Sequence, residues 1–183
     1  MFVPEKGMTK NMKLTLNILD LSSQYTVRKM TAKDVDCIYE LYMENPMYFR
    51  YCPPLATKES VLKDMSALPL HKTEEDKYYI GFFKGTKLVA VMDLIFHYPD
   101  KQTVFIGLFM VSGTEQGKGV GSEIINECCD YFLSQQYCFI RLGYAKGNPQ
   151  SEAFWKKNGF EKVGLEIDNE NYTVVVMQKQ LQG

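Results

Sequence analysis

Three glycines at alternate positions, Gly117, Gly119 and Gly121, stand between an apolar run and an amphipathic run of this sequence. Residues 104–111 are almost continuously hydrophobic, as expected of a strand that is covered on both faces. Residues 124–133 carry apolar side chains at helical spacing. Glycine accepts positive φ angles and close ligand approach, and the first turn of a helix attracts anions. The segment predicts a strand, a phosphate-binding loop and a helix; the alternative is an ordinary flexible turn.

Two common nucleotide-binding motifs do not fit this loop. A P-loop needs a glycine five residues before Gly117, where Ser112 stands, and Ser or Thr after the lysine, where Gly119 stands. The dinucleotide fingerprint needs a third glycine at Ser122. A nucleotide-binding protein is therefore the least favoured alternative.

The segment Gln116–Gly121 resembles the coenzyme A loop of the GNAT N-acetyltransferase superfamily, (Arg/Gln)-x-x-G-x-(G/A). Its surroundings are also similar to that family. Phe109-Met110-Val111 ends the preceding strand, Leu142-Gly143-Tyr144 is followed by Asn148, and Gly159-Phe160 closes the next helix. The resemblance covers about residues 25–180 and is strongest over 103–160.

The resemblance implies a mixed α+β fold, with a central, mostly antiparallel sheet of about seven strands flanked by about four helices. Residues 14–183 are expected to form a single domain, and residues 1–13 a loose N-terminal extension. The implied activity is transfer of the acetyl group from acetyl-CoA to a primary amine of a small molecule or peptide, by direct attack in a ternary complex, without a metal. The alternative is a degenerate acetyl-CoA-binding sensor or regulatory protein.

The resemblance also assigns roles to individual residues. Backbone N–H groups of the loop are expected to hold the pyrophosphate; these belong to Gln116, Gly117, Lys118, Gly119, Val120, Gly121 and Ser122. Main-chain groups of Phe109 and Val111 are expected to pair with the pantetheine arm and stabilise the oxyanion. Asn148 either reaches the pantetheine or simply caps a helix.

The sequence departs from the family at both usual proton-transfer positions. Trp155 occupies the place of the usual tyrosine acid, so it forms a wall of the pantetheine site or belongs to the core. Phe105 occupies the place of the common glutamate base. The candidate substitutes are Asp93 and Tyr144, with water as an equal alternative to the tyrosine. Asp93, a carboxylate in an apolar strand, either binds the acceptor ammonium or relays its proton, or it simply pairs with a local N–H near the end of the strand.

Other polar and aromatic residues carry weaker signals. His97 lies beside a Tyr-Pro turn, which favours a solvated loop histidine over a base, and His71 receives no role. The acceptor pocket is expected between the first helix, the aromatic segment containing Tyr48, Phe49 and Tyr51, and the turn after Tyr98. The alternative for those aromatics is coverage of the core.

Hydrophobic periodicity and turn residues predict the element order βααβββαβαββ. The predicted strands of this order cover 25–30, 78–83, 87–96, 103–111, 139–144, 160–166 and 171–180, and residues 14–21 are expected to form a further short strand before them. Helices are expected after Thr31, after Thr57, after Gly121 and over about 151–157, and residues 47–56 are expected to form a loop.

The composition excludes several other classes of protein. A net charge of −1 argues against nucleic acid as the main partner, because phosphate binding needs a basic face. The five cysteines show no disulfide or zinc spacing, which favours a reducing compartment. Without a signal peptide or a long apolar run, the sequence predicts a cytoplasmic location and no membrane partner. Homodimers are common in the resembled family, and the sequence leaves this open.

Overall fold

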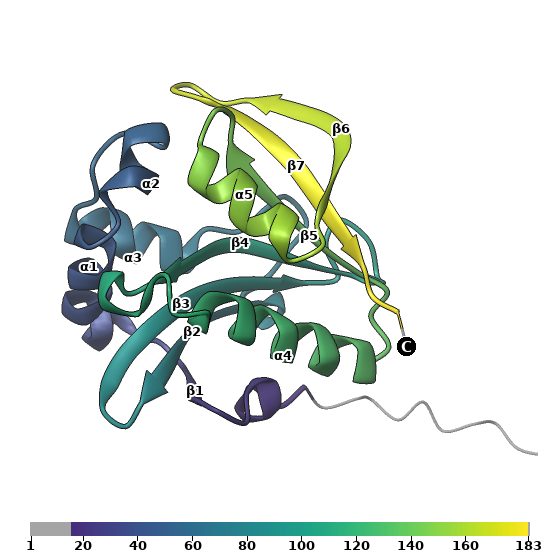
Figure 1. Cartoon of the computed structure of the whole chain (residues 1–183), viewed down its shortest axis with the longest axis horizontal. Helices are drawn as coiled ribbons and strands as arrows, with labels where there is room; N and C mark the ends of the chain where they lie inside the picture. The colour runs from purple at the N-terminus through teal and green to yellow at the C-terminus, as the bar shows by residue number, and fades with distance from the viewer. Residues whose placement is uncertain (1–15, 183) are drawn as a thin grey trace, which may run out of the picture.

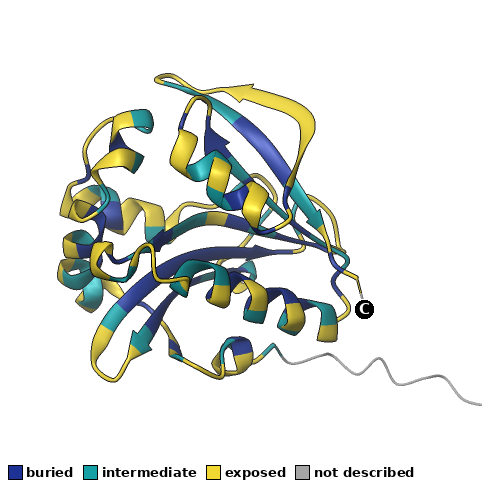
Figure 2. Cartoon of the chain, in the orientation of Figure 1, coloured by how far each residue is buried: buried dark blue, intermediate teal, exposed yellow. Residues whose placement is uncertain are grey.

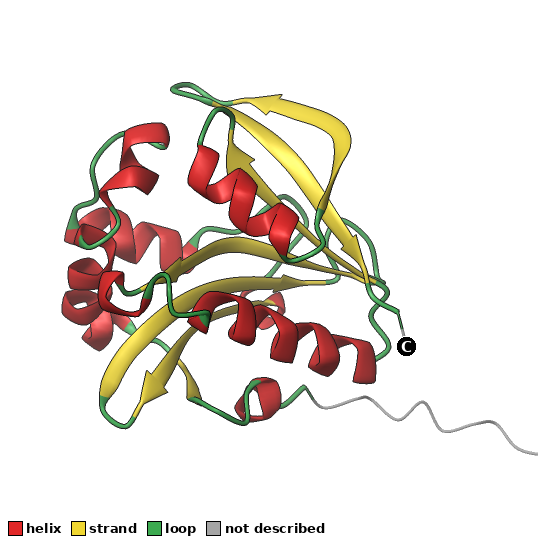
Figure 3. Ribbon diagram, viewed as in Figure 1, coloured by secondary structure: helices red, strands yellow, loops and turns green. Residues whose placement is uncertain are grey.

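The computed structural model describes residues 16–182, and its centre is one seven-stranded sheet (Figures 1 and 3). The strands are β1 (Thr26–Lys29), β2 (Lys77–Lys84), β3 (Lys87–Phe96), β4 (Thr103–Val111), β5 (Phe139–Ala145), β6 (Glu161–Asp168) and β7 (Thr173–Gln180). Their spatial order is β1-β2-β3-β4-β5-β7-β6, and every neighbouring pair is antiparallel except the parallel pair β4 and β5. The fold class predicted from the sequence is confirmed.

Helices cover both faces of this sheet (Figure 1). They are α1 (Val35–Met43), α2 (Pro46–Tyr51), α3 (Lys58–Ser66), α4 (Val120–Ser134) and α5 (Pro149–Lys157). In the described part of the chain this makes five α-helices, one more than expected.

The side-chain alternation of the strands divides the apolar interior into two cores. In β3, Ala90, Met92 and Leu94 face a core that contains Ile124 and other residues of α4. Val91, between them, faces the second core, which α1 and α3 cover. Figure 2 shows β3 as a largely buried strand at the centre of the molecule, whereas β6 at the edge is exposed along its length.

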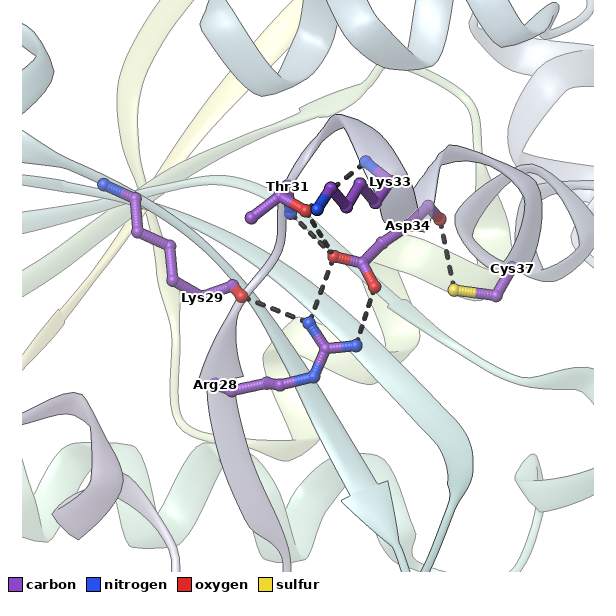
Figure 4. A network of polar contacts seen from close by, with 6 residues as sticks. All are labelled: Arg28, Lys29, Thr31, Lys33, Asp34 and Cys37. Carbon is purple, nitrogen blue, oxygen red and sulfur yellow. Dashed lines mark hydrogen bonds and ion pairs between the residues drawn. The ribbon is translucent and has the colours of Figure 1, made fainter.

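A polar network fixes the chain where β1 leads into α1 (Figure 4). Thr31 and Asp34 form a capping box: the Asp34 carboxylate accepts the Thr31 N–H at 2.8 Å. The same carboxylate accepts two hydrogen bonds from the guanidinium of Arg28, at 2.7 and 3.1 Å. This pairing holds the pKa of Asp34 down at about 2, and the sequence prediction of a cap at Thr31 is confirmed.

Two segments differ from the sequence prediction. Ile18–Leu21, part of the predicted strand 14–21, forms a short 3-10 helix in which the Asn17 side chain accepts the Leu19 N–H at 3.2 Å. The predicted loop 47–56 contains α2, because Pro46 occupies the first turn of a helix, where its missing N–H is not needed. The predicted extension over residues 1–13 lies outside the described residues.

Candidate active site

The glycine loop connects the end of β4 to the start of α4 through a single 3-10 turn, Gly113–Glu115. Gly117 and Gly119 adopt φ angles of +74° and +86°, and a Cβ atom on either would meet nothing within 4 Å. The glycines are thus needed for the backbone conformation, and the space beside them is open. The first hydrogen bond of α4 runs from the Glu123 N–H to the Gly119 carbonyl, so the preceding N–H groups of the helix start are available to an anion.

Side chains from distant parts of the chain hold this loop in place. The Gln116 amide donates to the Val111 carbonyl and to Asn45 Oδ1, both at 2.9 Å. Glu44 accepts the Ser112 hydroxyl at 2.7 Å through Oε2. Gln116 therefore contributes its side chain to the loop structure, whereas its backbone N–H, which the sequence assigns to the pyrophosphate, donates to the Gly113 carbonyl at 3.4 Å. Glu44 and Asn45 were missed, since no spacing links them to a loop about seventy residues away.

Beside the loop, the sheet opens between β4 and β5. The two strands pair only from Thr103 to Ile106 on β4, and they separate beyond that point. The Ser112 N–H donates to the Val89 carbonyl on the β3 side at 2.8 Å. Because N–H directions alternate along a strand, those of Phe109 and Val111 point to the open side. The two residues that the sequence assigns to the pantetheine arm therefore present their N–H groups to the open side, while the Val111 carbonyl accepts from Gln116 and Asn45.

A pocket of about 280 Å³ lies between the loop, this open edge and the start of α5. Eleven residues are predicted to bind the coenzyme, and nine of them line this pocket; the exceptions are Lys118 and Val120. The lining also contains Tyr48, which the sequence places at the acceptor pocket, and residues that the sequence reasoning missed: Asn45, Met110, Glu115, Gln150, Ser151, Phe154 and Lys157. The predicted loop residues and the predicted α5 residues, more than twenty positions apart, thus meet in one pocket.

Charged side chains of both signs surround the loop. Glu115 lies 2.8 Å from Lys87 Nζ and 3.9 Å from Lys118 Nζ. The hydrogen bond from Lys87, together with the charges of Lys118, Lys87 and Lys84, holds the pKa of Glu115 below its usual value. Lys84, Lys87 and Lys118 are matched there by Glu115, Glu44 and Glu123, so the anion site rests on the backbone N–H groups and the dipole of the helix start.

Asn148 and Trp155 each combine a structural role with a place in the pocket wall. Asn148 Oδ1 caps α5 by accepting the N–H groups of Gln150 and Ser151, each at 3.1 Å. This fits the capping role that the sequence left open, and the side chain also lines the pocket. Trp155 packs edge-on against Phe154 and Phe160, with ring centroids 4.9 and 5.1 Å away, so it belongs to both core and wall.

A second pocket of about 230 Å³ lies where β4 and β5 separate. The two pockets have five lining residues in common: Tyr48, Phe109, Asn148, Ser151 and Trp155. Phe105 and Tyr172 belong to the second pocket alone. The Phe105 ring packs edge-on against Tyr98 at 5.4 Å. Of the aromatics predicted for an acceptor pocket, Tyr48 lines it, whereas Phe49 is buried in the core under α1.

Asp93 lies behind the wall of the second pocket. Its Oδ2 is 2.7 Å from Lys77 Nζ, and both side chains are buried. Its Oδ1 has no hydrogen-bond partner among the described residues. The carboxylate fills the space beside Gly107, where a Cβ atom would lie 2.5 Å from Oδ2, and Gly107 itself lines the pocket. Burial raises the pKa of Asp93 to about 6, although Lys77 opposes the rise.

The remaining predicted proton-transfer residues lie in different surroundings. Tyr144 lines the second pocket, and its hydroxyl interacts with Lys162 and Glu152, which form an ion pair at 2.8 Å. Burial is the main cause of its raised pKa. His97 is exposed in the turn after β3 and lies 3.2 Å from the Tyr137 hydroxyl, outside both pockets.

Within residues 16–182, no group of three or more His, Cys, Asp or Glu side chains is placed to hold a metal ion. In the same part of the chain, no helix has both the length and the apolar character that crossing a bilayer requires.

Several solved structures share this fold. An acetyltransferase from Thermus thermophilus is 20% identical and superposes with a TM-score of 0.68, covering 86% of this chain and 97% of that one. The spermidine N-acetyltransferase of Vibrio cholerae, solved with CoA and spermine, is 20% identical with a TM-score of 0.64, covering 87% and 97%. The ribosomal-protein-S18-alanine N-acetyltransferase of Escherichia coli is 11% identical with a TM-score of 0.63, covering 87% and 95%.

Sequence comparison gives the family. A curated relative, an uncharacterized N-acetyltransferase of Methanocaldococcus jannaschii, is 23% identical over 150 residues, which is 80% of this chain and 65% of the relative. The family profile described as "Acetyltransferase (GNAT) family" matches residues 35–160, which include the glycine loop, the open strand edge and α5. The chain therefore belongs to the GNAT acetyltransferase family, as its loop sequence predicts.

Proposed function

We propose that this protein transfers the acetyl group of acetyl-CoA to a primary amine. The observation that carries the proposal is the meeting of two pockets at Phe109, Asn148 and Trp155, where the sheet opens. The first pocket has the glycine loop and the open N–H groups of a helix start, which suit a pyrophosphate. The second reaches the same strand edge and is free to hold an acceptor. The match to the GNAT family supports this chemistry.

The proposed binding mode uses main-chain groups. N–H groups from Gly117 to Ser122 hold the pyrophosphate at the start of α4. The pantetheine arm lies along the open side of β4, where Phe109 and Val111 point. The Phe109 N–H then donates to the thioester oxygen and stabilises the negative charge that develops on it.

In the proposed reaction, the neutral amine attacks the thioester carbon while both substrates are bound. Holding the two in adjacent pockets supplies much of the rate, because the bimolecular step becomes effectively unimolecular. The carbon–sulfur bond breaks, coenzyme A leaves as a thiolate, and the proton lost by the amine balances that charge. Asp93 is proposed to receive this proton through water beside Gly107, and Tyr144 or water to protonate the thiolate.

The first experiment measures thermal unfolding with and without acetyl-CoA, followed by thiol release with a panel of primary amines. The expected result is a rise in Tm with acetyl-CoA that exceeds the rise with ATP or NAD, and amine-dependent thiol release. Initial rates with both substrates varied should give intersecting lines, as a ternary complex requires. A rise in Tm without turnover of any amine would favour the sensor alternative, and no rise would reject the coenzyme site.

The role of Asp93 has its own test. Replacing it with asparagine should lower kcat or raise the KM for the amine, while the Tm shift with acetyl-CoA stays near that of the wild type. Unchanged amine kinetics would remove Asp93 from the reaction.

A further inference from the structure

The pocket between β4 and β5 has no charged residue in its wall. All sixteen residues that line it carry uncharged side chains at neutral pH. Six of them are aromatic: Tyr48, Phe105, Phe109, Tyr144, Trp155 and Tyr172. A ligand that enters meets ring faces, ring edges and small polar groups, and no carboxylate touches it directly.

The rings of this wall are held by neighbouring rings. Phe105 packs edge-on against Tyr98, and Tyr48 packs edge-on against Phe49 with centroids 5.0 Å apart. Trp155 is fixed by Phe160 behind it. Side chains that are already ordered lose little freedom when a ligand binds. The wall is therefore preorganised for a flat apolar group.

Charged side chains stand behind the wall and have a small net charge. Asp93 sits at Gly107 and is paired with Lys77. The charge of Asp64 on α3 contributes to raising the pKa of both Tyr48 and Tyr172, after the larger effect of burial. Asp64, Lys77 and Asp93 together carry one net negative charge. No carboxylate in the wall can pair with a second ammonium group that enters the pocket, and burying an unpaired charge is costly.

The size of the pocket is sufficient for one aromatic ring. A cavity of about 150 Å³ is sufficient for benzene in an engineered protein core. The pocket here measures about 230 Å³, and its Phe109 end adjoins the coenzyme pocket. This leaves room for a single ring and a short chain that carries the amine toward Phe109.

We propose that the preferred acceptor is a primary monoamine joined by a short chain to one aromatic ring, and that polyamines are rejected. This inference rests on the proposed N-acetyltransferase function. The ring lies against Phe105 and Tyr172, and the ammonium approaches over aromatic faces, where cations are attracted. The structurally similar V. cholerae protein is named for spermidine, so the same fold would here accept a different class of amine.

A comparison of three amines as acceptors separates the effect of a second charge from the effect of an aromatic ring. Butylamine and putrescine differ by one ammonium group, and butylamine and 2-phenylethylamine differ by a ring. We expect kcat/KM to fall at least about tenfold from 2-phenylethylamine to butylamine and again from butylamine to putrescine. Equal or faster turnover of putrescine would overturn this inference while leaving the N-acetyltransferase function intact.

A binding measurement covers the case in which none of the three is turned over. Trp155 is the single tryptophan of the chain and lines both pockets, so its fluorescence reports ligands directly. With coenzyme A present, 2-phenylethylamine should change this fluorescence at a concentration at least about tenfold lower than putrescine does. Equal or reversed affinities would overturn the inference whether or not the protein is an enzyme.

A matched pair of variants tests the uncharged wall. Phe105→Glu adds a carboxylate to it and should raise kcat/KM for putrescine while lowering that for 2-phenylethylamine. Phe105→Leu keeps the wall apolar, so it should lower kcat/KM for 2-phenylethylamine without raising kcat/KM for putrescine. Tyr172→Glu repeats the charge test from the other side of the pocket if the first variant does not fold. In each folded variant the Tm shift with acetyl-CoA should persist. If neither glutamate variant gains putrescine activity, the charge argument is wrong.

Discussion

Replacing Asp93 with asparagine should change how the stability of the protein depends on pH. Burial raises the pKa of Asp93 from 3.8 to about 6; Lys77 at 2.7 Å lowers it, and the charge of Asp64 raises it further. A carboxyl whose pKa is higher in the folded than in the unfolded chain stabilises the fold when it is protonated. This contribution is fully present below pH 3.8 and is lost as the pH rises through about 6.

The size of the effect follows from the two pKa values. One pH unit corresponds to about 1.4 kcal/mol, so the step from 3.8 to about 6 corresponds to about 3 kcal/mol in all. Asparagine resembles the protonated carboxyl, so the two proteins should be similarly stable at about pH 4. The free energy of unfolding of Asp93→Asn should then exceed that of the wild type by about 2 kcal/mol at about pH 7, because only the wild type ionises in between.

Urea unfolding followed by the fluorescence of Trp155 measures this difference at a series of pH values. Asp36→Asn is the matched control, since it removes a carboxylate whose side chain is 70% exposed. The reasoning would be refuted if Asp93→Asn were about 3–5 kcal/mol less stable than the wild type at neutral pH. That result would mean that the ion pair with Lys77 stabilises the fold by more than the burial of its charges costs.

Three further predictions concern the loop and the start of α1. Gly119→Val should raise the KM for acetyl-CoA at least about tenfold and reduce the Tm shift, because valine is strained at a φ of +86° and fills the space beside the loop. Gln116→Ala should destabilise the loop by about 1–2 kcal/mol, through the loss of two hydrogen bonds at 2.9 Å, and raise the same KM several-fold. Asp34→Ala should lower the free energy of unfolding at neutral pH by about 1–2 kcal/mol, less than a fully buried pair would give, because Arg28 is 44% exposed. The loss should shrink as the pH falls from 3.8 toward about 2, where the wild-type carboxylate is itself protonated; urea unfolding at several pH values measures it.

Local sequence signals predicted most of the fold. The alternate glycines, the apolar run before them and the helical spacing after them gave β4, the loop and α4 in their observed order. Thr31 and Thr57 marked helix starts because capping depends on residues only a few positions away. The 3-10 helix at Ile18 and helix α2 were missed, since both are short and carry mixed local preferences that tertiary packing decides.

The site was predictable only where it depends on local backbone. The coenzyme loop follows from glycine positions, and the sequence located it. Glu44, Asn45 and Tyr172 come from elements that reach the loop or the open edge only after the sheet has formed. The pairing of Asp93 with Lys77 joins two neighbouring strands, and its register is set by the hairpin. The position of Asp93 in an apolar strand indicated an unusual environment from the sequence alone, whereas no sequence pattern identified Lys77 as its partner.

The short β4–β5 pairing divides the sheet into two parts that can move relative to each other. Strands β1 to β4 form one stiff half and β5 to β7 the other, and they share pairing only along Thr103–Ile106. The two halves can therefore rotate slightly about this short ladder. Such a rotation changes the distance between β4 and β5 most where the strands are unpaired, which is where the two pockets meet. An extended ligand arm that is hydrogen-bonded to β4 and in contact with α5 would connect the two halves. Amide hydrogen exchange in the unpaired parts of β4 and β5 should then slow together when this ligand is bound, because each half restrains the other.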